Sequence, residues 1–326
     1  MKKIFITGGA GYVGAVTVPF LLEKGYEITV FDLMIYGEEV LKDHPKLIKV
    51  RGDIRDKEAL KAHITNHEVV IHLACISNDP SFELNPSLGK SINLDAFEPL
   101  VNISKDAGVK RFIYASSSSV YGVKDEKNVH ESMTLEPLTD YSKYKAECEE
   151  ILLKHQGPDF TTVTIRPATV CGYSQRQRLD VVVNILTNLA YHNRKITVFG
   201  GSQLRPNIHI KDMALAYLAL IEAPKEKING QIFNAGDENY SVNELSQIVK
   251  GVIGNDVEMI HSDSDDNRSY HISSKKILDT LDFQPTFSIE EAVVDLKRAF
   301  EKNLLTNPLE NENYFNIRRM QNINLI

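Results

Sequence analysis

The sequence predicts an α/β fold in which helices cover both faces of a doubly wound parallel sheet, followed by a smaller C-terminal lobe. In the first half of the chain, short runs of β-branched and apolar residues alternate with longer amphipathic stretches, as in repeated βαβ units. After residue 166 this alternation loosens, and polar, irregular segments such as 174–180 and 255–268 follow. The six runs predicted as strands are 3–7, 27–32, 47–51, 69–72, 111–116 and 161–166.

The second half of the chain still contains helix-like stretches, so we expect it to return to the first lobe after leaving it. These stretches are 211–221, 241–253 and 289–303. We expect a first domain over residues 1–168 and a substrate-binding lobe over 169–303. Residues 304–326 are rich in asparagine and are interpreted as a surface tail.

Composition argues against several classes of partner and site. Acidic residues outnumber basic ones by 44 to 37, and a formal net charge of −7 gives no general attraction to nucleic acid or an anionic membrane. No apolar stretch is long enough to span a bilayer, and glycines interrupt the N-terminal run too early for an export signal. The three cysteines are widely spaced, which argues against a disulfide framework and a cysteine metal site. We therefore expect a cytoplasmic protein without a metal.

The first predicted strand runs into a glycine-rich turn that is typical of a Rossmann-type dinucleotide site. Glycine permits the tight bend, the approach of a pyrophosphate to the backbone and the packing of the next helix against the strand. The N–H groups and positive dipole end of that helix then receive the pyrophosphate. The turn fits G-x-x-G-x-x-G, and its candidate cofactor-binding residues are Gly8, Gly11, Tyr12, Val13 and Gly14.

An acidic residue, Asp32, ends the second predicted strand where this fingerprint places a carboxylate on the adenosine ribose. Residues 33–37 contain no Lys or Arg to receive a 2′-phosphate, so NAD is expected rather than NADP. Residues 1–168 are therefore interpreted as an NAD-binding domain. Pro19 lies past the first turn of the helix that follows the glycines, and we expect a local bend there.

A tyrosine and a lysine, Tyr141 and Lys145, lie one helical turn apart at the start of a helix-like stretch. A phenol is a poor base at neutral pH unless its pKa is lowered, and we expect the Lys145 ammonium and a positive nicotinamide ring to lower it. Tyr191 and Lys195 have the same spacing, but no serine-rich strand end precedes them. A serine after the strand at 111–116 can hydrogen-bond a substrate oxygen, so the first pair is the candidate for removing a proton from an alcohol beside a nicotinamide.

These residues resemble the extended short-chain dehydrogenases of the NAD-dependent epimerase/dehydratase family, of which UDP-glucose 4-epimerase is a well-known member. The resemblance extends to about residue 303. It is carried by the glycine turn, Gly52-Asp53-Ile54, His72-Leu73-Ala74, Asn93, Val120-Tyr121-Gly122, Tyr141 with Lys145, and the segment from Arg205 to Asp212.

The resemblance also implies roles for residues outside the glycine turn. Asp53 and Ile54 should flank the adenine, and Leu73, Ala74 and Asn93 should line the inner half of the cofactor. Counting back from Val120-Tyr121-Gly122 places Ser117 at the catalytic serine or threonine position, ahead of its neighbours Ser118 and Ser119. The resemblance implies that Arg205 and Arg268 bind the nucleotide pyrophosphate. Further candidates for substrate binding are Ser77, Thr169, Arg176 and Arg178.

Departures from the family pattern narrow the expected reaction. Dehydratases of this family have Asp-Glu directly after the catalytic hydroxyl residue, whereas this chain has Ser118-Ser119. Some 3,5-epimerising reductases have a cysteine where Ser119 stands. Ser77 and Thr169 replace a lysine and an asparagine of the UDP-glucose 4-epimerase pocket, which leaves the sugar open. We expect a nucleotide-sugar epimerase that acts through a 4-keto intermediate.

Two alternative functions remain open beside the epimerase. A nucleotide-sugar 4-dehydrogenase or 4-ketoreductase would use the same serine, tyrosine and lysine but would change the redox state of the cofactor. A non-catalytic NAD sensor is disfavoured because this chain keeps both Tyr141 and Lys145. The resemblance further implies a nucleotide-diphosphate sugar as the substrate, and a homodimer built from the stretches 94–107 and 141–154.

Overall fold

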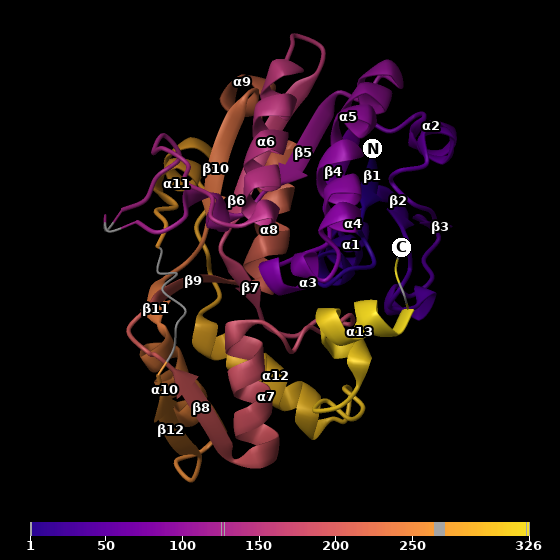
Figure 1. The fold of residues 1–326 in the computed structure, drawn as a ribbon. Helices are drawn as coiled ribbons and strands as arrows, with labels where there is room; N and C mark the ends of the chain where they lie inside the picture. Colours follow the sequence, from indigo (N-terminus) through magenta and orange to yellow (C-terminus); the bar gives the residue numbers. More distant parts are fainter. Residues whose placement is uncertain (1, 125, 127, 264–270, 324, 326) are drawn as a thin grey trace.

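The computed structural model describes residues 2–124, 126, 128–263, 271–323 and 325 (Figure 1). Its main sheet is a seven-stranded parallel sheet with the order β10-β6-β5-β4-β1-β2-β3. The predicted fold class is therefore confirmed. The strands are β1 (Lys3–Thr7), β2 (Glu27–Asp32), β3 (Leu47–Arg51), β4 (Val69–His72), β5 (Arg111–Ala115), β6 (Thr161–Pro167) and β10 (Gln231–Ala235).

The six strands predicted in the first half are present as β1 to β6, with ends that differ by at most one residue. The seventh strand, β10, comes from the second half of the chain and pairs in parallel with β6. In the sheet, β1 lies between β2 and β4, so the strand order reverses beside β1. Ligands of such sheets bind outside the carboxyl ends of the strands at this reversal.

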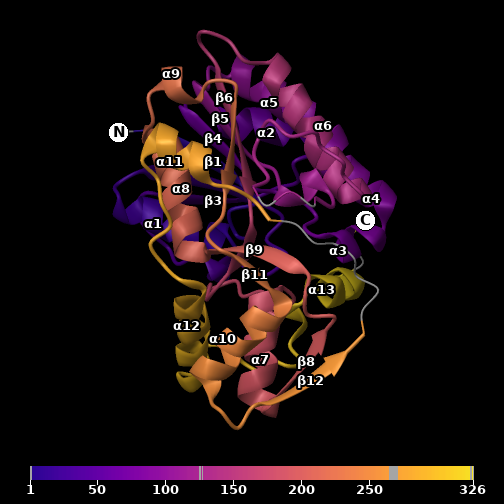
Figure 2. The same ribbon diagram turned by 90° about the vertical axis from the view of Figure 1, so that its left-hand side faces the viewer.

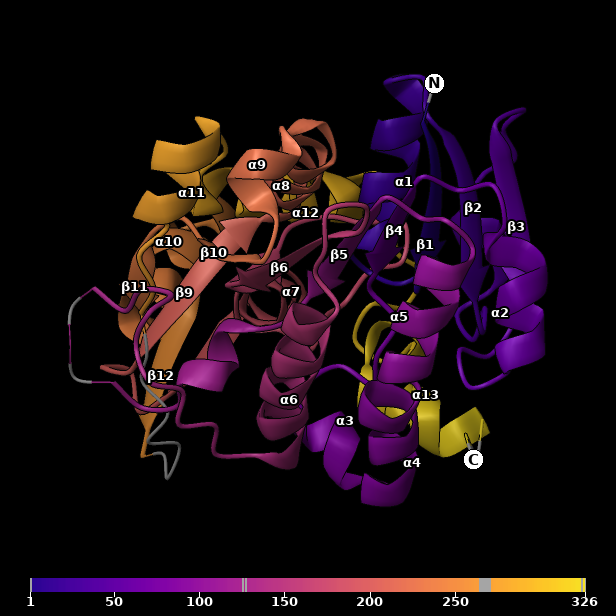
Figure 3. The same ribbon diagram turned by 90° about the horizontal axis from the view of Figure 1, so that it is seen from above.

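Two apolar clusters cover the two faces of the main sheet because successive side chains of a strand point to opposite sides. Ile4 and Ile6 belong to one cluster, whereas Phe5 between them belongs to the other. Figure 3, seen from above, shows helices on both sides of the sheet. The first cluster packs against α1 (Gly14–Glu23), α8 (Ile210–Glu222) and α11 (Lys275–Leu281), and the second against α2 (Lys57–Ile64), α5 (Phe97–Asp106) and α6 (Asp140–Lys154).

A buried histidine, His72, ends β4 in the middle of the sheet and is 2% exposed. Its Nδ1 lies 2.7 Å from the Thr7 hydroxyl, and its ring stacks on that of Tyr114. Burial, with the nearby charge of Lys145, lowers the pKa of His72 to about 3. Since an unfolded histidine titrates near pH 6.5, only the unfolded chain binds this proton between the two values.

Acid should therefore destabilise the protein through His72. The contribution of neutral His72 is fully present above about pH 6.5 and is lost as the pH falls below that value. Lowering the pH from 7 to 5 should reduce the free energy of unfolding by about 2 kcal/mol more in wild type than in His72→Asn. Urea unfolding at the two pH values measures this difference. The exposed His44→Asn should keep the wild-type difference, and parallel behaviour of His72→Asn and wild type would contradict the prediction.

The second lobe consists of two small sheets and their helices (Figure 2). One sheet has the order β11-β9-β7 and the other pairs β12 with β8 in parallel. The strand β12 lies in the segment 255–268, so the prediction of an irregular segment there is wrong; its pairing with β8 could not be seen locally. The elements are β7 (Thr169–Cys171), β8 (Lys195–Phe199), β9 (Leu204–His209), β11 (Asn239–Ser241), β12 (Glu258–Ser262), α7 (Val182–Asn193), α10 (Val242–Ile253) and α12 (Ile289–Glu301).

The helices predicted in the second half are present as α8, α10 and α12. Capping boxes at Ser241 and Ser288 explain why α10 and α12 begin where they do, since each serine and the glutamate three residues later satisfy backbone N–H groups. The short elements are η1 (Glu38–Val40), α3 (Asp79–Glu83), α4 (Pro86–Lys90), η2 (Ser91–Asp95), η3 (Ser118–Tyr121), α9 (Lys225–Ile228), η4 (Glu312–Tyr314) and α13 (Asn316–Ile323).

The C-terminal residues do not form a surface tail, so that prediction is wrong. Helix α13 packs against α3, and its residues Asn316 and Met320 are only 5% and 9% exposed. The polar composition of this segment hid a helix whose few apolar side chains join the core cluster of α5 and α6. Pro19 lies inside α1, and the bend expected there stays a prediction. Among the described residues, no helix has the length and apolar character needed to cross a membrane.

Candidate active site

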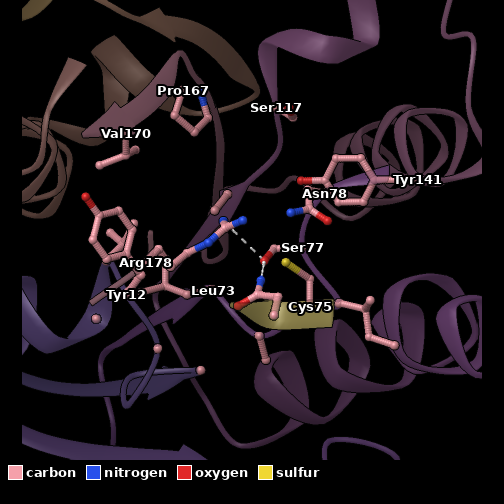
Figure 4. A pocket seen from close by; sticks show the side chains of 18 of the residues that line it. Tyr12, Leu73, Cys75, Ser77, Asn78, Ser117, Tyr141, Pro167, Val170 and Arg178 are labelled. Atoms are coloured by element: carbon pink, nitrogen blue, oxygen red, sulfur yellow. Dashed lines mark hydrogen bonds between the residues drawn. The ribbon is translucent and has the colours of Figure 1, made fainter. Parts of the chain in front are cut away.

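A cavity of about 510 Å³ opens at the carboxyl ends of the central strands and extends to the second lobe. Figure 4 shows Ser117 and Tyr141 in this cavity together with Ser77, Tyr12 and Arg178. Most of the residues singled out in the sequence line it. They are Gly8, Gly11, Tyr12, Val13, Gly14, Asp32, Asp53, Ile54, Leu73, Ala74, Ser77, Ser117, Tyr141, Lys145, Thr169, Arg176, Arg178 and Arg205.

The glycine turn has no room for side chains. Gly8 has a φ of +74°, and a Cβ on it would lie 2.5 Å from the backbone nitrogen of Ala74. A Cβ on Gly14 would lie 2.3 Å from the carbonyl oxygen of Gly9. Helix α1 begins at Gly14, and the N–H groups of Ala15 and Thr17 in its first turn donate to the carbonyls of Gly11 and Val13, which ties the helix to the turn. The turn therefore fits a closely approaching diphosphate.

The carboxylate of Asp32 is fixed at the end of β2 by two backbone groups. Its Oδ2 accepts a hydrogen bond of 3.0 Å from the Ala10 N–H, and its Oδ1 accepts one of 2.8 Å from the Met34 N–H. Each oxygen keeps a further lone pair for another donor. Burial raises the pKa of Asp32, and these two hydrogen bonds oppose that effect. The geometry suits a carboxylate that receives ribose hydroxyls.

Of the other residues assigned to the cofactor, all but Asn93 line the cavity. Asp53 lines the cavity while its carboxylate accepts hydrogen bonds from the Arg55 guanidinium, of which the shortest is 2.6 Å. Ile54, Leu73 and Ala74 line the same cavity. Asn93 does not belong to the described lining. Its side chain instead bonds both the N–H and the carbonyl of Ile76 at 2.9 Å, which holds the loop after β4.

The serine, tyrosine and lysine come together from two elements. A capping box at Thr139 begins α6, which places Tyr141 in its first turn and Lys145 one turn later. The Lys145 ammonium donates to the Ala115 carbonyl at 2.7 Å and lies 5.8 Å from the centroid of the Tyr141 ring. Ser117 follows β5 in extended conformation, and its hydroxyl lies 2.8 Å from that of Ser119. The arrangement brings two hydroxyls and an ammonium into one cavity.

Burial and neighbouring groups shift the pKa of Tyr141 in opposite directions. Desolvation raises the pKa of Tyr141 well above its usual value, with Cys75 and Asp79 adding to the rise. The groups that lower this pKa are Arg178 and the hydrogen bond with Ser117. Lys145 lies 5.8 Å from the ring centroid with its ammonium bonded to the Ala115 carbonyl, and the lowering expected from it and from a nicotinamide stays a prediction. The bond to Ser117 also distinguishes this serine from Ser118 and Ser119.

The second tyrosine and lysine pair lies far from this arrangement. Tyr191 is in α7 and its ring packs on Phe300, while Lys195 begins β8. Arg194 between them adopts the left-handed conformation that ends the helix. The two residues therefore do not share a helical face, and neither lines the cavity among the described residues.

Two arginines, Arg176 buried and Arg178 half-buried, line the cavity. The Arg178 guanidinium donates to Asp180 at 2.8 Å and approaches the Ser77 hydroxyl at 3.5 Å. That of Arg176 stacks on Tyr36, 3.5 Å from the ring centroid. Among the described residues, Arg176 Nε and Arg178 Nη2 have no hydrogen-bond partner, which fits an anionic ligand.

The remaining substrate candidates are placed less completely. Thr169 begins β7 and lines the cavity, as does Arg205 on β9, whose Nη1 donates to the Leu204 carbonyl at 3.0 Å. Arg268 lies outside the described residues. No group of three His, Cys, Asp or Glu side chains in the described part of the chain is placed to hold a metal ion.

Several lining residues were missed in the sequence. Tyr36 follows Asp32 closely and could have been found from its place after β2, and Asp79 from its place after β4. Asn316 and Met320 carried no signal, because they lie in the segment taken as a tail. Tyr12 was assigned to the cofactor, but its hydroxyl also joins the two lobes by donating to the Gly172 carbonyl at 2.7 Å.

Known proteins resemble this chain in both sequence and fold. A putative UDP-glucose 4-epimerase of Methanocaldococcus jannaschii is 30% identical over 297 residues, which cover 89% of this chain and 95% of that protein. A mouse dTDP-D-glucose 4,6-dehydratase is 26% identical over 93% of this chain and 89% of its own length. The crystal structure of a UDP-glucose 4-epimerase with UDP-glucose from Thermotoga maritima has a TM-score of 0.84 at 26% identity, covering 93% of this chain and 100% of that one.

The family model described as "NAD dependent epimerase/dehydratase family" matches residues 4–236, which is more than half of the chain. This match covers the glycine turn, the Ser117 strand end and the helix of Tyr141 and Lys145. The glycine turn, the cavity that contains Ser117, Tyr141 and Lys145, and the family match all indicate the same family. The chain belongs to the NAD-dependent epimerase/dehydratase family and is an NAD-dependent enzyme of the extended short-chain dehydrogenase type.

Proposed function

We propose that this enzyme is a nucleotide-sugar 4-epimerase that acts through a 4-keto intermediate. The observation that carries the proposal is the cavity in which Ser117, Tyr141 and Lys145 lie beside the glycine turn, with hydroxyls and no carboxylates at 118 and 119. Such a site can remove and return hydrogen at one carbon. It lacks the adjacent acid pair that elimination at a neighbouring carbon requires.

Each residue of the trio has a separate task. Ser117 holds the C4 hydroxyl of the sugar, and Tyr141 takes the hydroxyl proton and returns it. NAD held by the glycine turn and Asp32 would supply the acceptor and donor of the C4 hydride. Arg178 and Ser117 lower the pKa of Tyr141 against the effect of burial, so they favour its role as a base. The bond to the Ala115 carbonyl holds the Lys145 ammonium next to Tyr141.

The substrate side of the cavity suits a nucleotide-diphosphate sugar. Arg178 and Arg205 line it and can pair with phosphate oxygens through their planar forks. Ser77 and Thr169 offer hydroxyls to the sugar or nucleotide. Relatives named for UDP-glucose and dTDP-glucose support this substrate class without deciding the base or the sugar.

Two oxidoreductive alternatives use the same residues. A 4,6-dehydratase needs acid and base groups beside the trio, and the lining acids nearest to it are already engaged. Thr139 donates to Asp79 at 2.5 Å, and Arg178 binds Asp180. A 4-dehydrogenase or 4-ketoreductase would need no further residue, and the fate of the cofactor separates it from an epimerase.

A panel of UDP-, dTDP-, GDP- and CDP-sugars tests the proposal. We expect NMR to show inversion at C4 of at least one sugar while absorbance shows no accumulation of NADH. Stoichiometric formation or consumption of NADH would establish the dehydrogenase or reductase instead. A 4-keto-6-deoxy product would establish a dehydratase, and Tyr141→Phe serves as the inactive control in each assay.

We also propose that the enzyme is a cytoplasmic homodimer formed through α5 and α6. These helices lie side by side on one face of the sheet (Figure 3), and Leu153 of α6 is 43% exposed. Burial of such a residue against a second copy would remove apolar surface from water. Sedimentation at micromolar concentration should give twice the mass of the chain, and Leu153→Glu should shift it toward a monomer. A monomeric wild type would refute the proposal.

A further inference from the structure

The last helix of the chain forms one wall of the cofactor cavity. In Figure 1, α13 lies between the main sheet domain and the second lobe, next to α3. Asn316, Met320 and Leu325 line the cavity. Met320 belongs to the same apolar cluster as Ile54, the residue expected beside the adenine. The C-terminal clasp, defined here as residues 312–323, therefore closes the cavity from the side of the cofactor's adenosine half.

One side chain of the clasp, Asn316, holds three loops together. Its Oδ1 accepts hydrogen bonds from the Tyr36 hydroxyl at 3.0 Å and from the Arg176 guanidinium. Its Nδ2 donates to the Ser77 hydroxyl at 2.9 Å, and its backbone N–H donates to Asp180 at 2.9 Å. These partners follow β2, β4 and β7, so one residue connects three carboxyl strand ends around the cavity.

A second residue fastens the clasp to the loop after β2. The Arg319 guanidinium donates to the Ile35 carbonyl at 2.7 Å through Nε, and a further bond of 2.6 Å joins it to Glu312 at the start of the clasp. Charge-assisted hydrogen bonds of this kind are stronger than neutral ones. Since Ile35 and Tyr36 lie in the loop that follows Asp32, the clasp is anchored beside the expected ribose site.

The clasp also sets the position of a buried cation. Arg176 is 4% exposed, stacks on Tyr36 and donates to Asn316, and among the described residues its Nε has no partner. It lies close enough to Asp32 to lower the pKa of that carboxyl against the larger effect of burial. A buried cation that lines a cavity without a partner for one donor is suited to an anion. The position beside Asp32 and Tyr36 favours the diphosphate of the cofactor over that of the sugar nucleotide.

We propose that the C-terminal clasp is a cofactor-retaining element: Asn316 and Arg319 hold it closed over the NAD pocket, Asn316 orients Arg176 toward the diphosphate, and NAD leaves only when the clasp opens. The inference concerns the cofactor alone, and it holds whether the enzyme is an epimerase or a 4-dehydrogenase. A retained cofactor suits a reaction in which the same hydride is removed and returned.

Release of NADH from the full chain tests the proposal in the absence of any sugar. The protein is loaded with NADH and mixed with excess NAD, and the decay of nicotinamide fluorescence gives the release rate. We expect Asn316→Ala/Arg319→Ala to release NADH at least about tenfold faster than wild type, because several hydrogen bonds that keep the clasp closed are lost. The matched control is Arg318→Ala on the exposed face of the same helix, which should stay within about twofold of wild type.

Hydrogen exchange of the wild-type protein provides a test that does not depend on a variant. Backbone amides of residues 316–323 should exchange more slowly with saturating NAD than without it, because a bound cofactor holds the clasp closed. Equal NADH release from the double variant and wild type, with native circular dichroism, would overturn the proposal. Exchange in the clasp that NAD leaves unchanged would overturn it as well. Both measurements are independent of the sugar panel, so the two proposals fail separately.

Discussion

Replacing Tyr141 with phenylalanine is expected to lower the turnover number about 10²- to 10⁴-fold, the range that a positioned general base contributes. In the proposed mechanism the phenol removes and returns the proton of the C4 hydroxyl, and Ser117 and Arg178 lower its pKa. The ring and its packing in α6 remain. The expected loss is therefore in the chemical step, and single-turnover formation of enzyme-bound NADH measures it.

Tyr191→Phe is the matched control for this substitution. Tyr191 has the same spacing to a lysine, but its ring packs on Phe300 in the second lobe. We expect Tyr191→Phe to keep the wild-type turnover number, and both variants to keep the wild-type binding of NADH. If Tyr141→Phe turned over as fast as Tyr191→Phe, the assignment of Tyr141 as the base would be wrong.

Breaking the buried ion pair that contacts Ser116 should cause the largest loss of stability. Arg166 and Glu149 have side chains that are 2% and 3% exposed, and their shortest contact is 2.5 Å. Glu149 also accepts a hydrogen bond from Ser116, and Arg166 donates to the Tyr121 hydroxyl at 2.7 Å. The charge of each partner is compensated by the other and by such polar neighbours, to which the Glu131 carbonyl also belongs.

Glu149→Gln should therefore reduce the free energy of unfolding by about 3–5 kcal/mol, because it leaves the Arg166 cation buried without a counter-charge. Urea unfolding at neutral pH measures the change. Asp279→Asn removes one partner of an exposed pair with Lys275 and should cost no more than about 1 kcal/mol. A Glu149→Gln protein as stable as this control would show that the buried pair contributes nothing net.

The hydrophobic pattern was sufficient to predict the sheet of the first half. The runs from β1 to β6 are short, β-branched and separated by amphipathic stretches, and buried parallel strands have this composition because both of their faces are covered. The glycine turn and Asp32 were visible for a similar reason. Backbone atoms approach Gly8 and Gly14 so closely that a side chain is excluded. The presence of glycine at these positions therefore predicts the close approach.

Features that depend on partners far apart in the chain could not be predicted in this way. Strand β12 forms because β8 lies beside it, and β10 enters the main sheet because it finds β6. The side chain of Asn93 binds the N–H and the carbonyl of Ile76, partners that no local pattern indicates. Arg178, which lowers the pKa of Tyr141, was not expected to act on this residue, because only the fold brings the two together.

The sequence by itself determined the dinucleotide-binding sheet, the glycine turn and the Tyr141 and Lys145 pair, because each rests on local spacing and residue type. The tertiary structure alone decided how the cavity is closed. In the sequence, Asn316 cannot be told from other polar residues of the predicted tail. Its role depends on Tyr36, Ser77 and Arg176, which follow strand ends and lie within hydrogen-bonding distance of it. Such contacts are set by the packing of the whole chain, and no local pattern encodes them.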